Sequence, residues 1–191
     1  MSVIITNKTA IEMWQGLVHN ACETCQQPLE EELESYLVFM LMRHLQDSSL
    51  ASKPMAPDYL KGMQTQGQSG IQQLQLVGDQ CLLCSGLYPY RSRRRLVKAQ
   101  YYIDIGRSAY LQMASRAKRS SIQLYENLSR YFVEMMDILQ ALRYSANPEL
   151  LDSLLLMENW QDNHSRYARK LLQKRYGDIN LHLHPSKNIK Q

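Results

Sequence analysis

The feature that most constrains this chain is a row of apolar residues that recurs at alternating intervals of three and four. An α-helix turns once every 3.6 residues, so such a row lies along one side of a helix, and about five turns of it are typical of a helix at the centre of a bundle. We therefore expect Phe132 to lie in the core, since an exposed row of this length would promote aggregation. The row consists of Tyr125, Leu128, Phe132, Met135, Leu139 and Leu142.

The same spacing predicts helices along most of the chain. Thr9 and Glu12 form a capping box, which predicts that a first helix begins there, and Pro28 with the three glutamates after it predicts the start of a second. Alternation of apolar and polar residues, which is typical of strands, is confined to the short segment 2–6. The sequence predicts an all-α, single-domain bundle of about six or seven helices. Further helices are expected at about 57–64, 71–86, from about 94, across the apolar row, after Asn147 and up to Gly177.

The length and the distribution of residue types predict one domain without a membrane span. We expect a bundle over 1–177, with a long connection at 47–70 that carries one short helix, and a disordered tail at 178–191. The longest strongly apolar run, 36–42, is far shorter than the roughly 18 residues that cross a bilayer, so no membrane insertion is expected. The first residues lack a basic segment followed by an apolar run, and we expect a cytoplasmic protein.

The charge is distributed unevenly along the chain. Residues 1–80 carry four Lys or Arg against nine Asp or Glu, a net charge of −5, whereas residues 81–191 carry eighteen against nine, a net charge of +9. The basic part could bind an acidic partner, face the acidic part of the same chain, or be solvated on the opposite side. Solvation or self-complementarity is the preferred interpretation.

Four cysteines form two Cys-x-x-Cys pairs, Cys22 with Cys25 and Cys81 with Cys84. Four thiolates have the ligand count of a tetrahedral zinc site, but 55 residues separate the pairs, and neither pair lies in a Gly-containing turn. The spacing of Cys81 and Cys84 places them on the apolar side of a helix. Buried structural thiols are therefore the preferred interpretation, ahead of zinc ligands and redox groups, and no cofactor is expected.

A basic cluster follows the second cysteine pair. It comprises Arg91, Arg93, Arg94, Arg95 and Lys98. Asp79 and Asp104 lie close to glycines on otherwise apolar helices on either side of it, and we expect them partly buried in ion pairs with these arginines. Alternatively, the cluster binds a protein partner or the phosphates of RNA or DNA.

No short motif in the sequence identifies a reaction. Gly-x-Ser-x-Gly, a phosphate-binding glycine loop, His-Glu-x-x-His, the helix-turn-helix signature and the RNP motif are all absent. The chain instead has ten methionines and twelve tyrosines, large side chains that suit a groove for a partner helix and equally fill a core. We therefore expect a non-enzymatic adaptor that binds another protein, with a nucleic-acid-binding regulator as the alternative.

The segments ESYLVFMLMRHL, VGDQCLLCSGLYPYRSRRRLVKAQYYIDIGRSAYLQMA and MMDILQALR resemble a set of uncharacterised helical proteins of proteobacteria, over roughly 34–143. No activity accompanies that family. The size and the helical, Asn- and Gln-rich character are similar to small cytoplasmic adaptors of Legionella-type type IVB secretion systems, which sit with chaperone subunits on a coupling protein. That resemblance implies an adaptor or chaperone subunit, although the basic second part departs from the acidic character expected of a secretion chaperone.

Overall fold

The computed structural model describes residues 2–44, 55–90 and 97–177. Within these ranges it contains nine α-helices, one 3-10 helix and no strand, which confirms the all-α prediction. The expected number of helices, six or seven, was too low, in part because the apolar row spans two helices instead of one. The helices are α1 (Ser2–Cys25), α2 (Glu31–His44), α3 (Met55–Gln64), α4 (Gly67–Gly86), α6 (Ala99–Arg116), α7 (Arg119–Arg130), α8 (Phe132–Tyr144), α9 (Ser153–Asn163) and α10 (Arg166–Tyr176).

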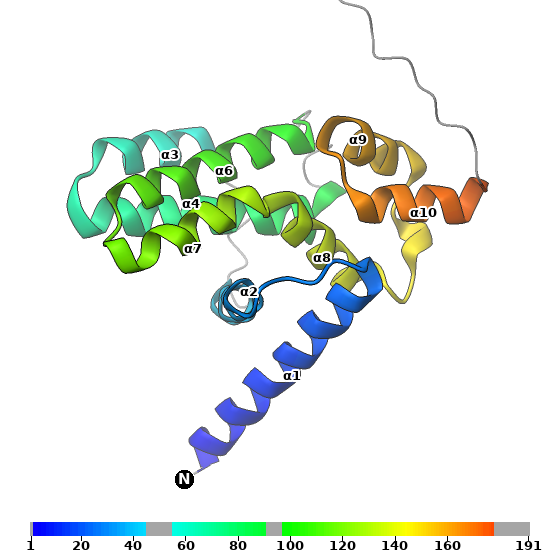
Figure 1. Cartoon of the computed structure of the whole chain (residues 1–191), viewed down its shortest axis with the longest axis horizontal. Coiled ribbons are helices and arrows are strands. Elements are labelled where there is room, and N and C mark those ends of the chain that lie inside the picture. The colour runs from blue at the N-terminus through cyan, green and yellow to red at the C-terminus, as the bar shows by residue number, and fades with distance from the viewer. Residues whose placement is uncertain (1, 45–54, 91–96, 178–191) are drawn as a thin grey trace, which may run out of the picture.

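Four helices, α3, α4, α6 and α7, run side by side and form the larger part of the body, shown in Figure 1. Helices α8, α9 and α10 pack at one end of this group, and α2 crosses beneath it, seen end-on in the same view. Helix α1 packs against α8 near its carboxyl end and then extends away from the body, so that the N-terminus lies at the tip (Figure 1). No helix in the described ranges is both long and apolar enough to cross a membrane.

The apolar row forms the centre of the core, as its spacing predicts. Leu128, Phe132, Met135 and Leu139 are completely buried. The helix bends within the row at Tyr131, yet its hydrogen bonds continue, since the Tyr131 amide donates to Asn127 O and the Tyr131 carbonyl accepts from the Met135 amide. The aromatic ring of Phe132 lies directly over Gly106, where an added Cβ would come within 2.4 Å of Cε2. The ring of Phe132 therefore packs directly on the backbone of α6 in the core of the bundle.

Several predicted helix boundaries were wrong. Helix α1 already begins at Ser2, so Thr9 lies inside it and does not cap it, and the segment 2–6 is helical. Pro28 belongs to the link before α2, which begins at Glu31. The short helix expected in the connection is present as α3, whereas residues 47–54 and the tail at 178–191 lie outside the described residues.

Candidate functional site

Helices α1 and α2 form a hairpin whose geometry is set by a short link. Gln26 adopts a left-handed backbone conformation with φ of 56°, and the Gln27 amide donates to Cys22 O, which together end α1. The glutamates Glu31, Glu32 and Glu34 lie in the first turn of α2, where they interact favourably with the positive end of the helix dipole. This hairpin carries most of the acidic residues of the described N-terminal part.

The carboxylate of Asp137, on α8, fixes the closed end of the hairpin. Gln27 Nε2 donates to Asp137 Oδ2 over 3.1 Å, Ser165 Oγ donates to Oδ1 over 2.6 Å, and the Tyr167 amide donates to Oδ2 over 3.2 Å. The Cys25 thiol lies 3.5 Å from the carbonyl oxygen of the same aspartate. A single buried carboxylate thus joins the hairpin, α8 and α10.

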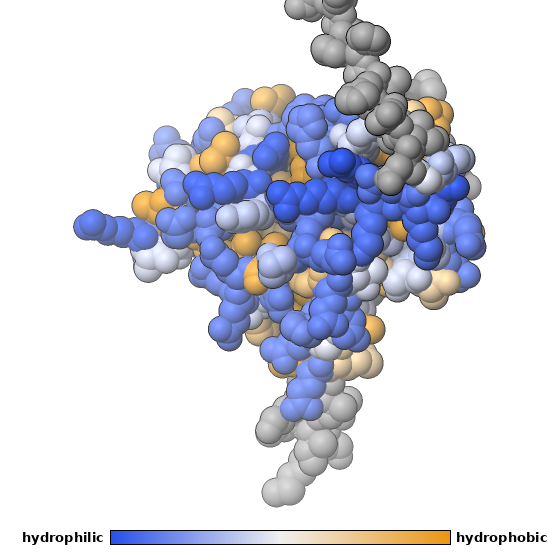
Figure 2. Space-filling view, turned by 45° about the vertical axis from the view of Figure 1, so that its right-hand side comes forward, coloured by the Kyte–Doolittle hydropathy of each residue, from blue (hydrophilic) through white to orange (hydrophobic). Residues whose placement is uncertain are grey.

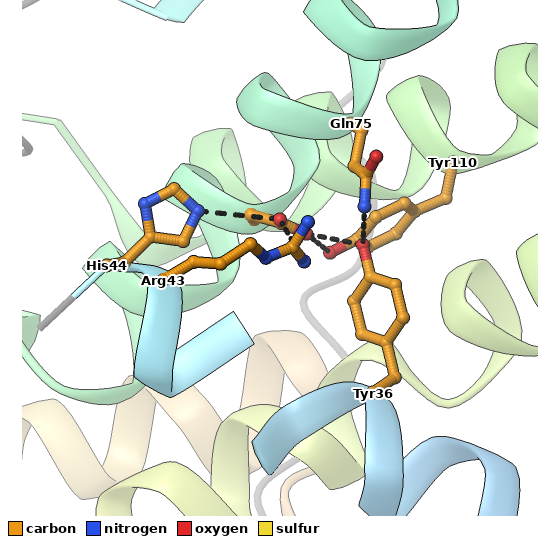
Figure 3. Close-up of polar contacts among 6 residues, drawn as sticks. Tyr36, Arg43, His44, Gln75 and Tyr110 are labelled. Carbon is orange, nitrogen blue, oxygen red and sulfur yellow. Dashed lines mark hydrogen bonds and ion pairs between the residues drawn. The ribbon is translucent and has the colours of Figure 1, made fainter. Parts of the chain in front are cut away.

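A second buried carboxylate, Asp79 on α4, holds the rest of α2. Tyr36 Oη donates to Asp79 Oδ1 over 2.6 Å and Tyr110 Oη, from α6, donates to the same oxygen over 3.0 Å. Arg43 Nη2 lies 3.2 Å and His44 Nε2 3.5 Å from Oδ2, and Figure 3 shows these side chains converging from three helices. Both carboxylates are 1% exposed, and a buried carboxylate is stable only when hydrogen-bonded or paired. Helix α2 is therefore held to α4 through Tyr36, Arg43 and His44.

Burial changes the acid–base behaviour of these groups. Desolvation raises the pKa of Asp137 to about 6, against the opposing effect of the hydrogen bonds from Ser165, Gln27 and the Tyr167 amide. Desolvation also raises the pKa of Tyr36 and Tyr110 well above the ordinary value, with a further contribution from the Asp79 charge beside each. Both phenols therefore stay protonated and act as hydrogen-bond donors. These buried hydrogen bonds join helices to one another, so the arrangement has a structural role.

An open groove separates α1 from α2. Its volume is about 340 Å³. His19 lies between two glutamates, with Nε2 3.8 Å from Glu23 Oε1 on its own helix and Nδ1 3.9 Å from Glu34 Oε2 on the facing helix. Both walls are therefore acidic or polar, and the groove suits a positively charged ligand. The lining residues are Gln15, Gly16 and His19 of α1 and Glu31, Glu34, Ser35 and Val38 of α2.

Exposed apolar side chains occur on the projecting part of α1. Met13 is 55% and Leu17 42% exposed, one helical turn apart. Large exposed apolar residues also occur on other helices, and on the face drawn in Figure 2 the hydrophobic areas are small and separate on a mostly hydrophilic surface. Such scattered residues are normal for soluble domains, so exposure alone does not single out α1. Between residues 10 and 17 no described side chain is fully buried, as is also true of the first eight residues of α7, and what sets α1 apart is its projection from the body (Figure 1).

All four cysteines are buried, as the spacing of the second pair indicates. Desolvation raises the pKa of Cys22 to about 12 and also raises those of Cys25 and Cys81. Among the described residues, no three His, Cys, Asp or Glu side chains lie close enough together to hold a metal ion, so the two pairs do not form one cluster. Thiols that resist ionisation are poor zinc ligands and poor nucleophiles, which favours the structural interpretation.

The prediction that Asp104 is partly buried was wrong. Its side chain is exposed and accepts a hydrogen bond from Gln100 Nε2 at 2.7 Å, one turn earlier on α6. Asp79 is buried as expected, but its described ion-pair partners, Arg43 and His44 from α2, are not members of the basic cluster. The position of an aspartate in an apolar helix predicts its burial only when its neighbours on the same side of the helix are apolar. Asp104 lies on the side of α6 that faces outward.

The expected arginine partners, Arg91, Arg93, Arg94 and Arg95, lie outside the described residues. Lys98, the last member of the basic cluster, is described: its ammonium lies 3.8 Å from Asp162 Oδ2, and its side chain is 73% exposed. On the other side of the cluster, Tyr90 Oη accepts from the Asp152 amide at 2.8 Å and donates to Leu150 O. Both flanks of the segment 91–96 are therefore attached next to α9.

Sequence reasoning missed Asp137, Tyr36 and His44 as junction residues. Asp137 stands between Met136 and Ile138 in an otherwise apolar stretch, and this position was a signal of a buried carboxylate. Nothing local indicated its partners, since Gln27 is 110 residues away.

No protein-family model matches the chain, and neither a comparison with curated proteins nor one with solved structures gave a match.

Proposed function

We propose that this chain is a non-enzymatic, cytoplasmic adaptor that binds another protein through the α1–α2 hairpin. The observation that carries the proposal is the projection of α1 beyond the body of the molecule (Figure 1). The helix has 24 residues, a length of about 36 Å at 1.5 Å per residue, and among its side chains from residue 10 onward the fully buried ones begin at Val18. An isolated helix is marginally stable in water, so a protein partner that covers the projecting part of α1 would stabilise it.

Two further features support binding rather than catalysis. The polar junctions around Asp79 and Asp137 are buried and satisfied by hydrogen bonds from within the chain, so they serve to position the hairpin. The thiols are buried with raised pKa values. The resemblance to adaptors of type IVB secretion systems suggests a coupling complex as one assembly in which such a subunit would act.

Affinity purification from the native cell extract tests this proposal. We expect a defined set of proteins to be recovered with the wild-type chain and lost with the double variant Met13→Ser/Leu17→Ser, which alters exposed side chains only. The matched control is Leu150→Ser/Leu154→Ser, which removes two apolar side chains elsewhere that are at least as exposed, and it should recover the same proteins. Identical recovery with all three chains would contradict binding through α1.

Nucleic-acid binding is the second candidate, and the basic cluster at 91–98 together with α10 favours it. Helix α10 carries Arg166, Arg169, Lys170, Lys174 and Arg175 and no acidic residue. If phosphates are the ligand, the affinity for RNA or DNA falls steeply with salt and is lost in the triple variant Arg93→Ala/Arg94→Ala/Arg95→Ala. A weak affinity that this variant does not change would exclude the second candidate.

A further inference from the structure

We infer that the groove between α1 and α2 receives a basic helical segment of the partner protein. This inference rests on the proposed function and adds the chemistry of the occupant. The groove is a different surface from the apolar side chains Met13 and Leu17, which are not among its lining residues. The two surfaces can therefore be tested separately.

The charge of the hairpin selects a basic occupant. Residues 10–44 contain six glutamates and a single Lys or Arg, which is Arg43. Arg43 is paired with Asp79. Glu31 and Glu34 line the wall formed by α2, and Glu23, just beyond the groove on α1, lies beside the lining residue His19. Carboxylates in the groove and at its edge reinforce one another's field, so lysine and arginine side chains are attracted there, whereas nucleic acids and anionic lipid surfaces are repelled.

Gly16 gives the groove a place where a partner backbone can approach closely. A Cβ added at Gly16 would meet no atom within 4 Å, so no contact inside the chain requires a glycine there. Glycine within a helix costs roughly 0.5 to 1 kcal/mol relative to alanine. The bare backbone at this point, opposite the small side chain of Ser35, becomes useful when another helix lies in the groove, because small residues let helices pack at short distance.

The wall formed by α2 is fixed before any partner arrives. Asp79 holds Tyr36 and Arg43, while Asp137 holds the link through Gln27. A surface that is already ordered loses little entropy on binding, which favours affinity. An amphipathic helix laid between two helices is a common mode of peptide recognition, and here its polar side would carry the positive charges.

Selection from a displayed library of random peptides about 16 residues long, on the purified full-length chain, tests the inference without knowledge of the natural partner. We expect the enriched peptides to be rich in lysine and arginine and to become helical on binding, as seen by circular dichroism. Enrichment of acidic or neutral peptides, or no enrichment, would overturn the inference.

Substitutions in the groove test whether the selected peptides bind there. We expect Glu31→Gln/Glu34→Gln to raise the Kd of a selected peptide about tenfold or more, and Gly16→Leu, which changes no charge, to do the same by filling the groove. The control Glu149→Gln/Glu158→Gln removes two carboxylates outside the hairpin and should leave the Kd unchanged. An unchanged Kd in Gly16→Leu, with an unchanged melting curve, would refute the groove as the site.

The native-extract experiment separates this inference from the proposed function. If Met13→Ser/Leu17→Ser abolishes recovery of the partner while Gly16→Leu and Glu31→Gln/Glu34→Gln do not, the adaptor function stands and the groove inference fails. If all of these variants recover the same proteins, both fail.

Discussion

Replacing Asp137 by asparagine tests the buried carboxylate that joins the hairpin to α8 and α10. Burial raises the pKa of Asp137 from 3.8 to about 6 in the folded chain. Between these values the folded state holds more protons than the unfolded state, so the free energy of unfolding falls as the pH rises. Each pH unit corresponds to about 1.4 kcal/mol, and the whole interval therefore to about 3 kcal/mol. This contribution is present below pH 3.8 and is lost above about pH 6.

Once the Ser165 hydroxyl, which donates to Asp137 Oδ1, turns its proton away, asparagine should fit the site. Its side-chain oxygen can accept from Gln27 Nε2 and the Tyr167 amide, and its side-chain nitrogen can donate to Ser165 Oγ, as a protonated aspartate would. Asparagine does not titrate. We therefore expect the free energy of unfolding of the Asp137→Asn variant, relative to that of the wild-type chain, to rise by about 3 kcal/mol between pH 3.8 and pH 7.

Urea unfolding followed by circular dichroism, at several pH values across this interval, measures the difference. The matched control is Asp104→Asn, at an exposed carboxylate that accepts a hydrogen bond from Gln100, which should show little pH-dependent difference from the wild-type chain. A difference between Asp137→Asn and wild type that does not change with pH would refute the reasoning, since it would mean that Asp137 ionises normally in the folded chain.

Three further substitutions and one metal analysis have defined expectations. Phe132→Ala should lower the free energy of unfolding by about 3 to 5 kcal/mol, because it leaves a cavity over Gly106; an unchanged melting temperature would contradict this. Tyr110→Phe removes a hydrogen bond to a buried carboxylate and should cost about 1 to 3 kcal/mol in urea unfolding, and a neutral result would show that Asp79 does not need this donor. Cys81→Ser should cost about 1 to 3 kcal/mol through the burial of a hydroxyl, while an identical unfolding curve would argue against its burial. Metal analysis should find well under one zinc per chain, and stoichiometric zinc lost on mutation of Cys22 would overturn that expectation.

The sequence by itself determined the helices and most of the core. The row through Phe132 and Leu139 is buried as its spacing predicts, because helix formation and the side of a helix that faces inward depend on residues three and four apart. The predicted helix boundaries were less accurate where a local capping signal conflicted with the extent of the helix. Thr9 has the form of a cap, yet α1 continues through it to Ser2.

Only the tertiary structure decided which polar residues meet. Asp79 and Asp104 look alike in the sequence, but one is buried beneath Tyr36 and Tyr110 and the other is exposed on α6. The groove beside Gly16 likewise exists only because the link after α1 sets the two helices of the hairpin apart. Pairings across tens of residues depend on how helices pack against one another, and the spacing of residues along a single helix carries no information about a partner on another.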